Sequence, residues 1–211
     1  MGVNLPGASS LLAPFCEQVQ RKMQQIAISG VGGQGILFIT KLLAEAAMDM
    51  DCSVLISETH GMAQRGGNVI SHLKVSGRGA KDAPKNGGNR PARFTSPLIR
   101  PGKADIFLVL HTDGLAAHGF YVSPDGKTFC ARSEPSDKYS LDATKMASEL
   151  GSAISGNLVL LGFAAASGAL FCKSEDLRAV LKRYGGKRMD LNLKAFDAGV
   201  SEAEKRRLAA D

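Results

Sequence analysis

The chain has 211 residues, of which 44% are hydrophobic, and it carries a formal net charge of +6. This length and composition predict one sizeable α/β domain with an ordinary buried core. Its two closest cysteines, Cys16 and Cys52, are 36 residues apart and no CxxC pair occurs, which excludes a zinc or iron–sulfur site built from local spacing. The longest apolar stretch, residues 157–171, is too short to cross a bilayer comfortably, so we predict no membrane span.

The first 22 residues differ from the rest. They lack the cationic start of an export signal, and their apolar part is shorter than a convincing signal core. Met23 then begins MQQIAISGVGG, a natural start followed at once by a strand pattern. We therefore predict an N-terminal extension over 1–22, a domain over 23–211, and reduced thiols in the cytosol.

Strand and helix patterns alternate in the first half of the domain. A helix is predicted over 36–50, where Lys41, Glu45 and Asp49 recur every four residues between apolar positions. Such a narrow polar stripe indicates a helix that is buried on most sides. The strands on either side of it complete a βαβ unit of the length that a right-handed crossover needs. The predicted strands are residues 24–29, 53–57, 68–75 and 105–110.

Helices are predicted to dominate the second half. Before them, the turn SPDG suggests a small hairpin between residues 121–122 and 128–131. Ser174 is a plausible N-cap, and Ser201 with Glu204 has the spacing of a capping box. The predicted helices are residues 138–150, 157–170, 175–184 and 201–209.

A basic segment lies between the third and fourth predicted strands. From Arg78 to Lys103 there are seven Lys or Arg residues and one Asp. We interpret 78–103 as a basic loop on the surface. It is either a surface for phosphate-bearing ligands, nucleic acid or an acidic partner, or a solvated insertion.

The motif GVGGQG follows the first predicted strand and opens the first helix. Gly30 is placed for a tight turn, Gly32 for close approach of the backbone to a ligand, and Gly35 for close packing of helix on strand. Gly33 and Gln34 fall at the helix N-terminus, where N–H groups and the helix dipole attract anions. The motif predicts a nucleotide or other anionic ligand, although the same glycines also serve simple strand–helix packing.

A second polar motif, ETHGMAQRGG, begins at Glu58, where an acidic residue would contact the ribose of NAD. Its density of glycine and polar residues indicates instead an ordered loop that binds a ligand or forms an interface. His60 is able to exchange protons near neutral pH, and Arg65 to hold a phosphate or carboxylate, which makes both candidate catalytic residues. The candidate ligand-binding residues of this motif are Glu58, Gly61, Met62, Gln64, Arg65, Gly66 and Gly67.

Two further histidines have a place in the pattern. His72 lies within a strand, and we predict a satisfied, semi-buried structural side chain there. His111 ends a predicted central strand, the position where open α/β sheets bind ligands, and either role fits it. The sequence contains no GxSxG, P-loop, HExxH or GDG-then-Asn motif.

The paired motifs GVGGQGI at 30–36 and SETHGMAQRGGNV at 57–69 resemble the gamma subunits and domains of 2-oxoacid:ferredoxin oxidoreductases. The similarity is greatest to the beta subunits of indolepyruvate ferredoxin oxidoreductases. It continues through SPLIRPGKADIFLVL at 96–110, NLVLLG at 157–162 and NLKAFDAG at 192–199. The sequence departs from the family where a glutamate usually follows the strand that ends near residue 110, because His111 and Thr112 stand there.

The resemblance implies an α/β Rossmann-like three-layer fold with a mainly parallel central sheet. It also implies a cytoplasmic enzyme that decarboxylates a 2-oxo acid such as indolepyruvate oxidatively to an acyl-CoA and passes electrons to ferredoxin. In this family thiamine diphosphate, Mg²⁺ and [4Fe-4S] clusters belong to the partner subunit, so this chain is expected to act only in a hetero-oligomer. Residues 30–35 and 58–67 are then expected to line the cleft or to contact the partner subunit, on the side that faces coenzyme A, the cosubstrate. Neither nucleic acid nor a membrane is expected as a partner.

Two other functions fit parts of the sequence. GVGGQG with Glu58 is compatible with a stand-alone NAD-binding protein. The small residues of helix 157–170 are compatible with a structural assembly subunit that contacts no ligand.

Overall fold

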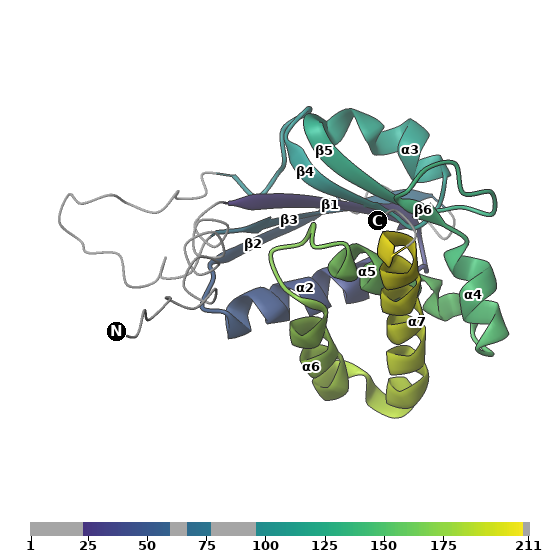
Figure 1. The fold of residues 1–211 in the computed structure, drawn as a ribbon. Helices are drawn as coiled ribbons and strands as arrows, with labels where there is room; N and C mark the ends of the chain where they lie inside the picture. Colours follow the sequence, from purple (N-terminus) through teal and green to yellow (C-terminus); the bar gives the residue numbers. More distant parts are fainter. Residues whose placement is uncertain (1–22, 60–66, 77–95, 209–211) are drawn as a thin grey trace, which may run out of the picture.

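The computed structural model describes residues 23–59, 67–76 and 96–208. A six-stranded sheet of order β2-β3-β1-β4-β5-β6 runs through the domain, with helices on both faces (Figure 1). Only β3 runs against the other strands of this sheet, because it pairs antiparallel with both β1 and β2. The mainly parallel three-layer α/β fold is therefore confirmed. The strands are β1 (Gln24–Val31), β2 (Val54–Thr59), β3 (Asn68–Val75), β4 (Ala104–Val109), β5 (Val122–Ala131) and β6 (Ser140–Leu141).

Helix α2 (Ile36–Asp49) has the predicted amphipathic character and is buried along most of its length. Its polar stripe faces the end of α6 (Ser174–Tyr184). Asp49 forms an ion pair with Arg183, and the Lys41 ammonium lies 4.6 Å from the centre of the Tyr184 ring. The stripe thus serves as the contact between two helices of one layer.

The main helical layer packs around α5 (Gly156–Ala166), which is buried over nearly its whole length. Helix α7 (Met189–Leu208) crosses α5 closely at two glycines. A Cβ at Gly162 would lie 2.1 Å from the Phe196 carbonyl oxygen, and one at Gly199 would lie 1.9 Å from the Val159 carbonyl oxygen. The small residues of the apolar stretch therefore pack inside the chain, whereas the assembly hypothesis needs them on the surface.

The opposite face of the sheet carries a thinner layer. It consists of the short helix α3 (Asp113–His118) and the 3₁₀ turn η1 (Gly119–Tyr121), above β1, β3 and β4 (Figure 1). The apolar cluster beneath them includes Ala27, Ile70 and Phe107 and is much smaller than the cluster on the α2–α5 face. Sequence patterns missed α3, because six residues are too few for a helical period to register.

The predicted hairpin around SPDG is wrong. Residues 122–131 form one strand, β5, parallel to β4, and the turn is a bulge within it. Pairing jumps from Ala104↔Val122 to Ile106↔Lys127, so four residues of β5 lie opposite one of β4. A glycine–proline turn signal predicts a change in backbone direction, and a bulge produces the same composition without reversing the strand.

Three helix boundaries also differ from the sequence prediction. Helix α4 (Ala143–Glu149) begins after residue 138 because residues 140–141 join the sheet as β6. The cap of α6 is Lys173, whose backbone N–H donates to Asp176, and Ser174 is already helical. The capping box at 201–204 is wrong because these residues lie inside α7. The remaining 3₁₀ turns are η2 (Ala153–Ser155) and η3 (Gly186–Arg188).

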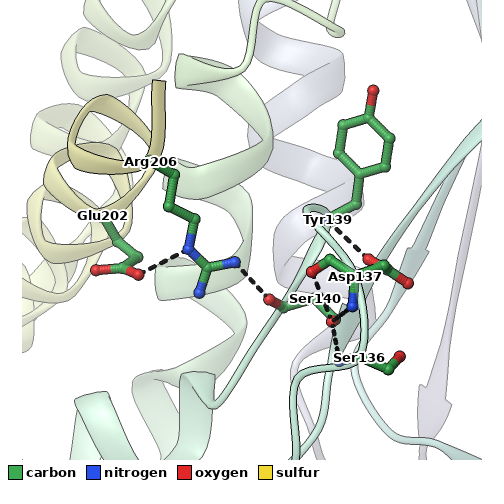
Figure 2. A network of polar contacts seen from close by, with 6 residues as sticks. All are labelled: Ser136, Asp137, Tyr139, Ser140, Glu202 and Arg206. Carbon is green, nitrogen blue, oxygen red and sulfur yellow. Dashed lines mark hydrogen bonds and ion pairs between the residues drawn. The ribbon is translucent and has the colours of Figure 1, made fainter. Parts of the chain in front are cut away.

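Helix α7 also ties β6 to the helical layer through Arg206 (Figure 2). Its Nη1 donates to the Ser140 carbonyl at 2.7 Å, and its Nε donates to Glu202 at 2.8 Å. The guanidinium also stacks 5.0 Å from the centre of the Phe163 ring. Among the described helices none is long and apolar enough to span a bilayer.

Candidate functional site

The glycine loop between β1 and α2 is closed by one of its own side chains. Gln34 Oε1 accepts a hydrogen bond from the Val31 N–H at 2.8 Å, while the Gln34 N–H donates to the Val31 carbonyl at 3.1 Å. A Cβ at Gly30, which lies within β1, would sit 2.6 Å from that amide oxygen. Gly30 thus makes room for the Gln34 side chain. The turn of the backbone from β1 into α2 is made at Gly33 and Gly35, whose φ angles are 97° and 75°.

Asn157, at the start of α5, holds this loop from outside. Its Nδ2 donates to the Gln34 carbonyl at 3.0 Å, and its Oδ1 accepts from the Leu158 N–H at 2.7 Å. A Cβ on Gly35 would lie 2.4 Å from Nδ2, so the close approach that Gly35 permits is to α5 and not to the strand. Sequence reasoning placed Asn157 only at the head of a helix; its long-range partner gives no local signal.

The loop lies at one edge of the sheet together with the second motif. Gly32 N–H donates to the Gly67 carbonyl at 3.1 Å, and Val31 pairs with Asn68, so β3 starts beside the loop. Glu58, the last residue but one of β2, lies near the same edge and is exposed to solvent. The structure therefore brings Gly30–Gly35, Glu58 and Gly67 to one edge. His60, Gly61, Met62, Gln64, Arg65 and Gly66 lie outside the described residues, as do 1–22 and residues 78–95 of the basic loop.

The same edge is a topological switch point. Helix α2 leaves β1 on one face, whereas α3 leaves the neighbouring parallel strand β4 on the other, and ligands of open α/β sheets bind at such points. His111 follows β4 here, partly exposed, and its Nδ1 lies 3.4 Å from the Asp113 carboxylate. Gly114 packs against Ser29, the residue before Gly30; a Cβ added to Gly114 would lie 2.6 Å from Ser29 Oγ.

The backbone N–H groups at this edge are placed to bind an anion. Helix α2 begins with Gly35 in the left-handed conformation, without a side-chain cap and without an acidic residue in its first turn. Its first N–H groups therefore lack partners within the helix and point out at the positive end of the dipole. Among the described residues, no atom lies within 4 Å of a Cβ built on Gly33, so this part of the chain leaves space beside the loop.

Metal chemistry has no support in the described part of the chain, where no group of three or more His, Cys, Asp or Glu side chains is placed to hold a metal ion. Cys130 and Cys172 are buried there, and burial raises the pKa of both thiols. Such thiols stay protonated at neutral pH and are poor metal ligands.

His72 differs from its prediction. The side chain is fully buried, not semi-buried, and within the described residues neither ring nitrogen has a hydrogen-bond partner. It lies on the face of the sheet that carries α3.

The comparison with known families decides the affiliation. Residues 25–202 match the family model described as pyruvate ferredoxin/flavodoxin oxidoreductase. The chain belongs to this family. The resemblance predicted from GVGGQG and ETHGMAQRGG is thereby confirmed.

Relatives in this family match the chain over most of its length. It is 29% identical to the indolepyruvate oxidoreductase subunit IorB of Pyrococcus horikoshii over 212 residues, which covers 87% of this chain and 98% of the relative. It is 30% identical to the same-named subunit of Archaeoglobus fulgidus, covering 84% and 94%.

Solved structures share the fold. The keto/oxoacid ferredoxin oxidoreductase gamma subunit of Geobacter sulfurreducens aligns with a TM-score of 0.64 at 22% identity, covering 86% of this chain and 99% of that chain. The 2-oxoglutarate:ferredoxin oxidoreductase of Magnetococcus marinus, with 2-oxoglutarate, coenzyme A and succinyl-CoA bound, aligns at 0.69 and 19% identity. That alignment covers 88% of this chain and 32% of the other.

Proposed function

We propose that the chain is a subunit of a 2-oxo acid:ferredoxin oxidoreductase that converts indolepyruvate or another aryl pyruvate to its acyl-CoA. The observation that carries this proposal is the match to nearly the full length of the indolepyruvate oxidoreductase subunits, 98% and 94% of their residues. By contrast, the ketoisovalerate oxidoreductase subunit VorA of Methanothermobacter thermautotrophicus is matched over 36% of its length. The chain therefore matches the separate subunits of the indolepyruvate enzymes and the separate gamma subunit of Geobacter sulfurreducens over nearly their whole length, unlike VorA; the choice of indolepyruvate rests on the sequence identity to the IorB subunits.

The chain is proposed to act only with a partner subunit. Thiamine diphosphate, Mg²⁺ and the [4Fe-4S] clusters belong to that partner in the proposed cytoplasmic hetero-oligomer, and ferredoxin accepts the electrons. Two features support this division: the cysteines are scattered, and the described residues offer no grouped metal ligands. The catalytic contribution of this chain is then to bind and orient a cosubstrate.

Coenzyme A is the ligand that the glycine loop fits best, since its phosphates are anions and its thiol accepts the acyl group. The uncapped start of α2 supplies N–H donors and a favourable dipole, and Gly33 leaves the approach open. Asn157 fixes the loop from α5, so the donors keep their direction when the ligand arrives. The coenzyme A bound to the Magnetococcus marinus enzyme supports this choice.

Strand order argues against the stand-alone NAD-binding alternative. An acidic residue that contacts the ribose ends the strand next to β1, but here β3 lies between β1 and β2. Glu58 is thus two strands from the glycine loop, about 10 Å at ordinary strand spacing. The assembly alternative expects the small residues of α5 to form an exposed interface, whereas α5 is buried within the chain.

Reconstitution tests the proposal. The chain alone, the thiamine-binding partner alone and their mixture are assayed for indolepyruvate-dependent reduction of ferredoxin in the presence of coenzyme A. We expect activity only in the mixture. A partner that is fully active by itself would refute the proposal, and micromolar calorimetric binding of NAD(H) to the isolated chain would favour the NAD alternative instead.

A further inference from the structure

The alternation of β3 places His72 under helix α3. Ile70, His72 and Lys74 point to the α3 face, whereas Leu73 belongs to the core on the other face. His72 has no exposed surface, and neither ring nitrogen finds a hydrogen-bond partner in the described part of the chain. A neutral imidazole carries at least one N–H, so this position leaves a buried donor unsatisfied, which requires an explanation.

A second histidine docks α3 beside the first. His118, the last residue of α3, is hydrogen-bonded through Nδ1 to the buried Ser29 Oγ at 2.7 Å. The ring of Tyr121, from η1, stands edge-on to His72, with 4.9 Å between ring centres and 76° between planes. The contact between this layer and the sheet therefore contains two imidazole rings: His118 belongs to α3, and His72 belongs to the sheet.

Groups around His72 disfavour a charged ring. The strands beside it present Ala27 from β1 and Ser57 from β2, both neutral. Lys74 follows on its own strand, and its Nζ donates to the Ser96 carbonyl at 3.0 Å. Burial, then His118 and then Lys74 lower the pKa of His72 to about 4.

The pKa values of two other groups at this contact are lowered as well. Burial lowers the pKa of His118, and burial followed by Arg100 lowers the pKa of Lys74. The Tyr121 ring contacts His72 through an edge-on aromatic contact. In the described part of the chain no carboxylate pairs with His72.

We propose that His72 and His118 form a pH-sensitive latch that keeps α3 and η1 docked on the sheet while both imidazoles are neutral and releases them when the rings are protonated. Release matters for the candidate site because α3 follows His111 directly at the ligand edge of the sheet. Gly114, in its first turn, packs against Ser29, next to Gly30. The latch thus couples proton concentration to the geometry of the glycine loop.

The sign follows from the lowered pKa. A ring whose pKa falls from 6.5 to about 4 on docking stabilises the docked state fully above pH 6.5, and that stabilisation is lost as the pH falls toward 4. For His72 alone the opening equilibrium of α3 rises about 30-fold between pH 7.5 and pH 5.0. His118 adds to this change in the same direction.

Hydrogen exchange of the full chain tests the latch. We expect the protection of α3 amides, corrected for intrinsic exchange, to fall about 30-fold from pH 7.5 to 5.0 while α5 amides change far less. The variant His72→Phe keeps an aromatic ring against Tyr121 and should lose most of this pH dependence. The matched control Phe120→Leu, which changes an exposed side chain of η1 that carries no titratable group, should retain it.

Two results would overturn the proposal: α3 protection that is flat with pH in the native chain, or a His72→Phe variant with the native slope. Should His72→Phe fail to fold, histidine ring titration by NMR in the native chain decides. The proposal requires a His72 ring that stays neutral below pH 5.5 while α3 is docked. A ring that titrates near 6.5 with α3 in place contradicts it.

Discussion

Replacing Gly35 by Ala probes the contact that joins the glycine loop to α5. Gly35 has φ 75° and ψ 28°, and an added Cβ would lie 2.4 Å from Asn157 Nδ2. The substitution therefore has two separate effects: it strains the backbone at a left-handed position, and it displaces the amide that donates to the Gln34 carbonyl.

Their magnitudes are separable. The left-handed conformation costs an L-residue about 1–2 kcal/mol, and losing the hydrogen bond costs about 1 kcal/mol. Gly35→Ala should thus lower the free energy of unfolding by about 2–3 kcal/mol in the native background. In an Asn157→Ala background the clash partner is gone, so only the strain of about 1–2 kcal/mol should remain. The expected coupling energy between the two positions is about 1 kcal/mol.

Urea unfolding of the four proteins in this cycle, followed by circular dichroism at pH 7.5, measures the coupling. The single variant Asn157→Ala is the internal control, because it removes both side-chain hydrogen bonds without straining Gly35. Equal cost of Gly35→Ala in both backgrounds would refute the inferred contact.

Two further substitutions test the helical layer. Gly199→Ala should destabilise the chain by about 2 kcal/mol or more, because its Cβ would lie 1.9 Å from the Val159 carbonyl oxygen. The control is Gly119→Ala, at a helical position where a Cβ meets no described atom within 4 Å; it should be neutral or slightly stabilising in the same thermal melt. Arg206→Gln should cost about 1–2 kcal/mol in urea unfolding through lost bonds to β6 and α7, whereas the exposed neighbour in Arg207→Gln should cost under about 0.5 kcal/mol; equal effects would contradict the role of Arg206.

Local patterns predicted the features that depend on near neighbours in sequence. Helix α2 and strand β3 follow from regular apolar periods, and the 3.6-residue period of the helix also fixes the position of the polar stripe on α2. The position of the glycine loop between β1 and α2 likewise follows from its own residues. What the local pattern leaves open is which distant segment meets each element.

Helix α3 was missed because it is short, but several other missed features depend on such distant contacts. Asn157 meets Gln34 across 123 residues, and its local surroundings resemble any helix start. The SPDG turn became a bulge because β5 pairs with β4, and β6 interrupted a predicted helix for the same kind of reason. The insertion of β3 between β1 and β2 removed Glu58 from the ribose position that chain order alone suggested.

The most direct test of the proposed function is the KM for coenzyme A in the reconstituted enzyme with Gly33→Asp and Gly33→Asn subunits. Both side chains tolerate positive φ, and a Cβ at Gly33 meets none of the described residues, so the two variants are compared for their difference in charge. If the loop binds the phosphates of coenzyme A, Gly33→Asp should raise that KM about tenfold over Gly33→Asn, with the KM for the 2-oxo acid unchanged. Equal KM values for coenzyme A in the two variants would contradict the assignment of the glycine loop to this ligand.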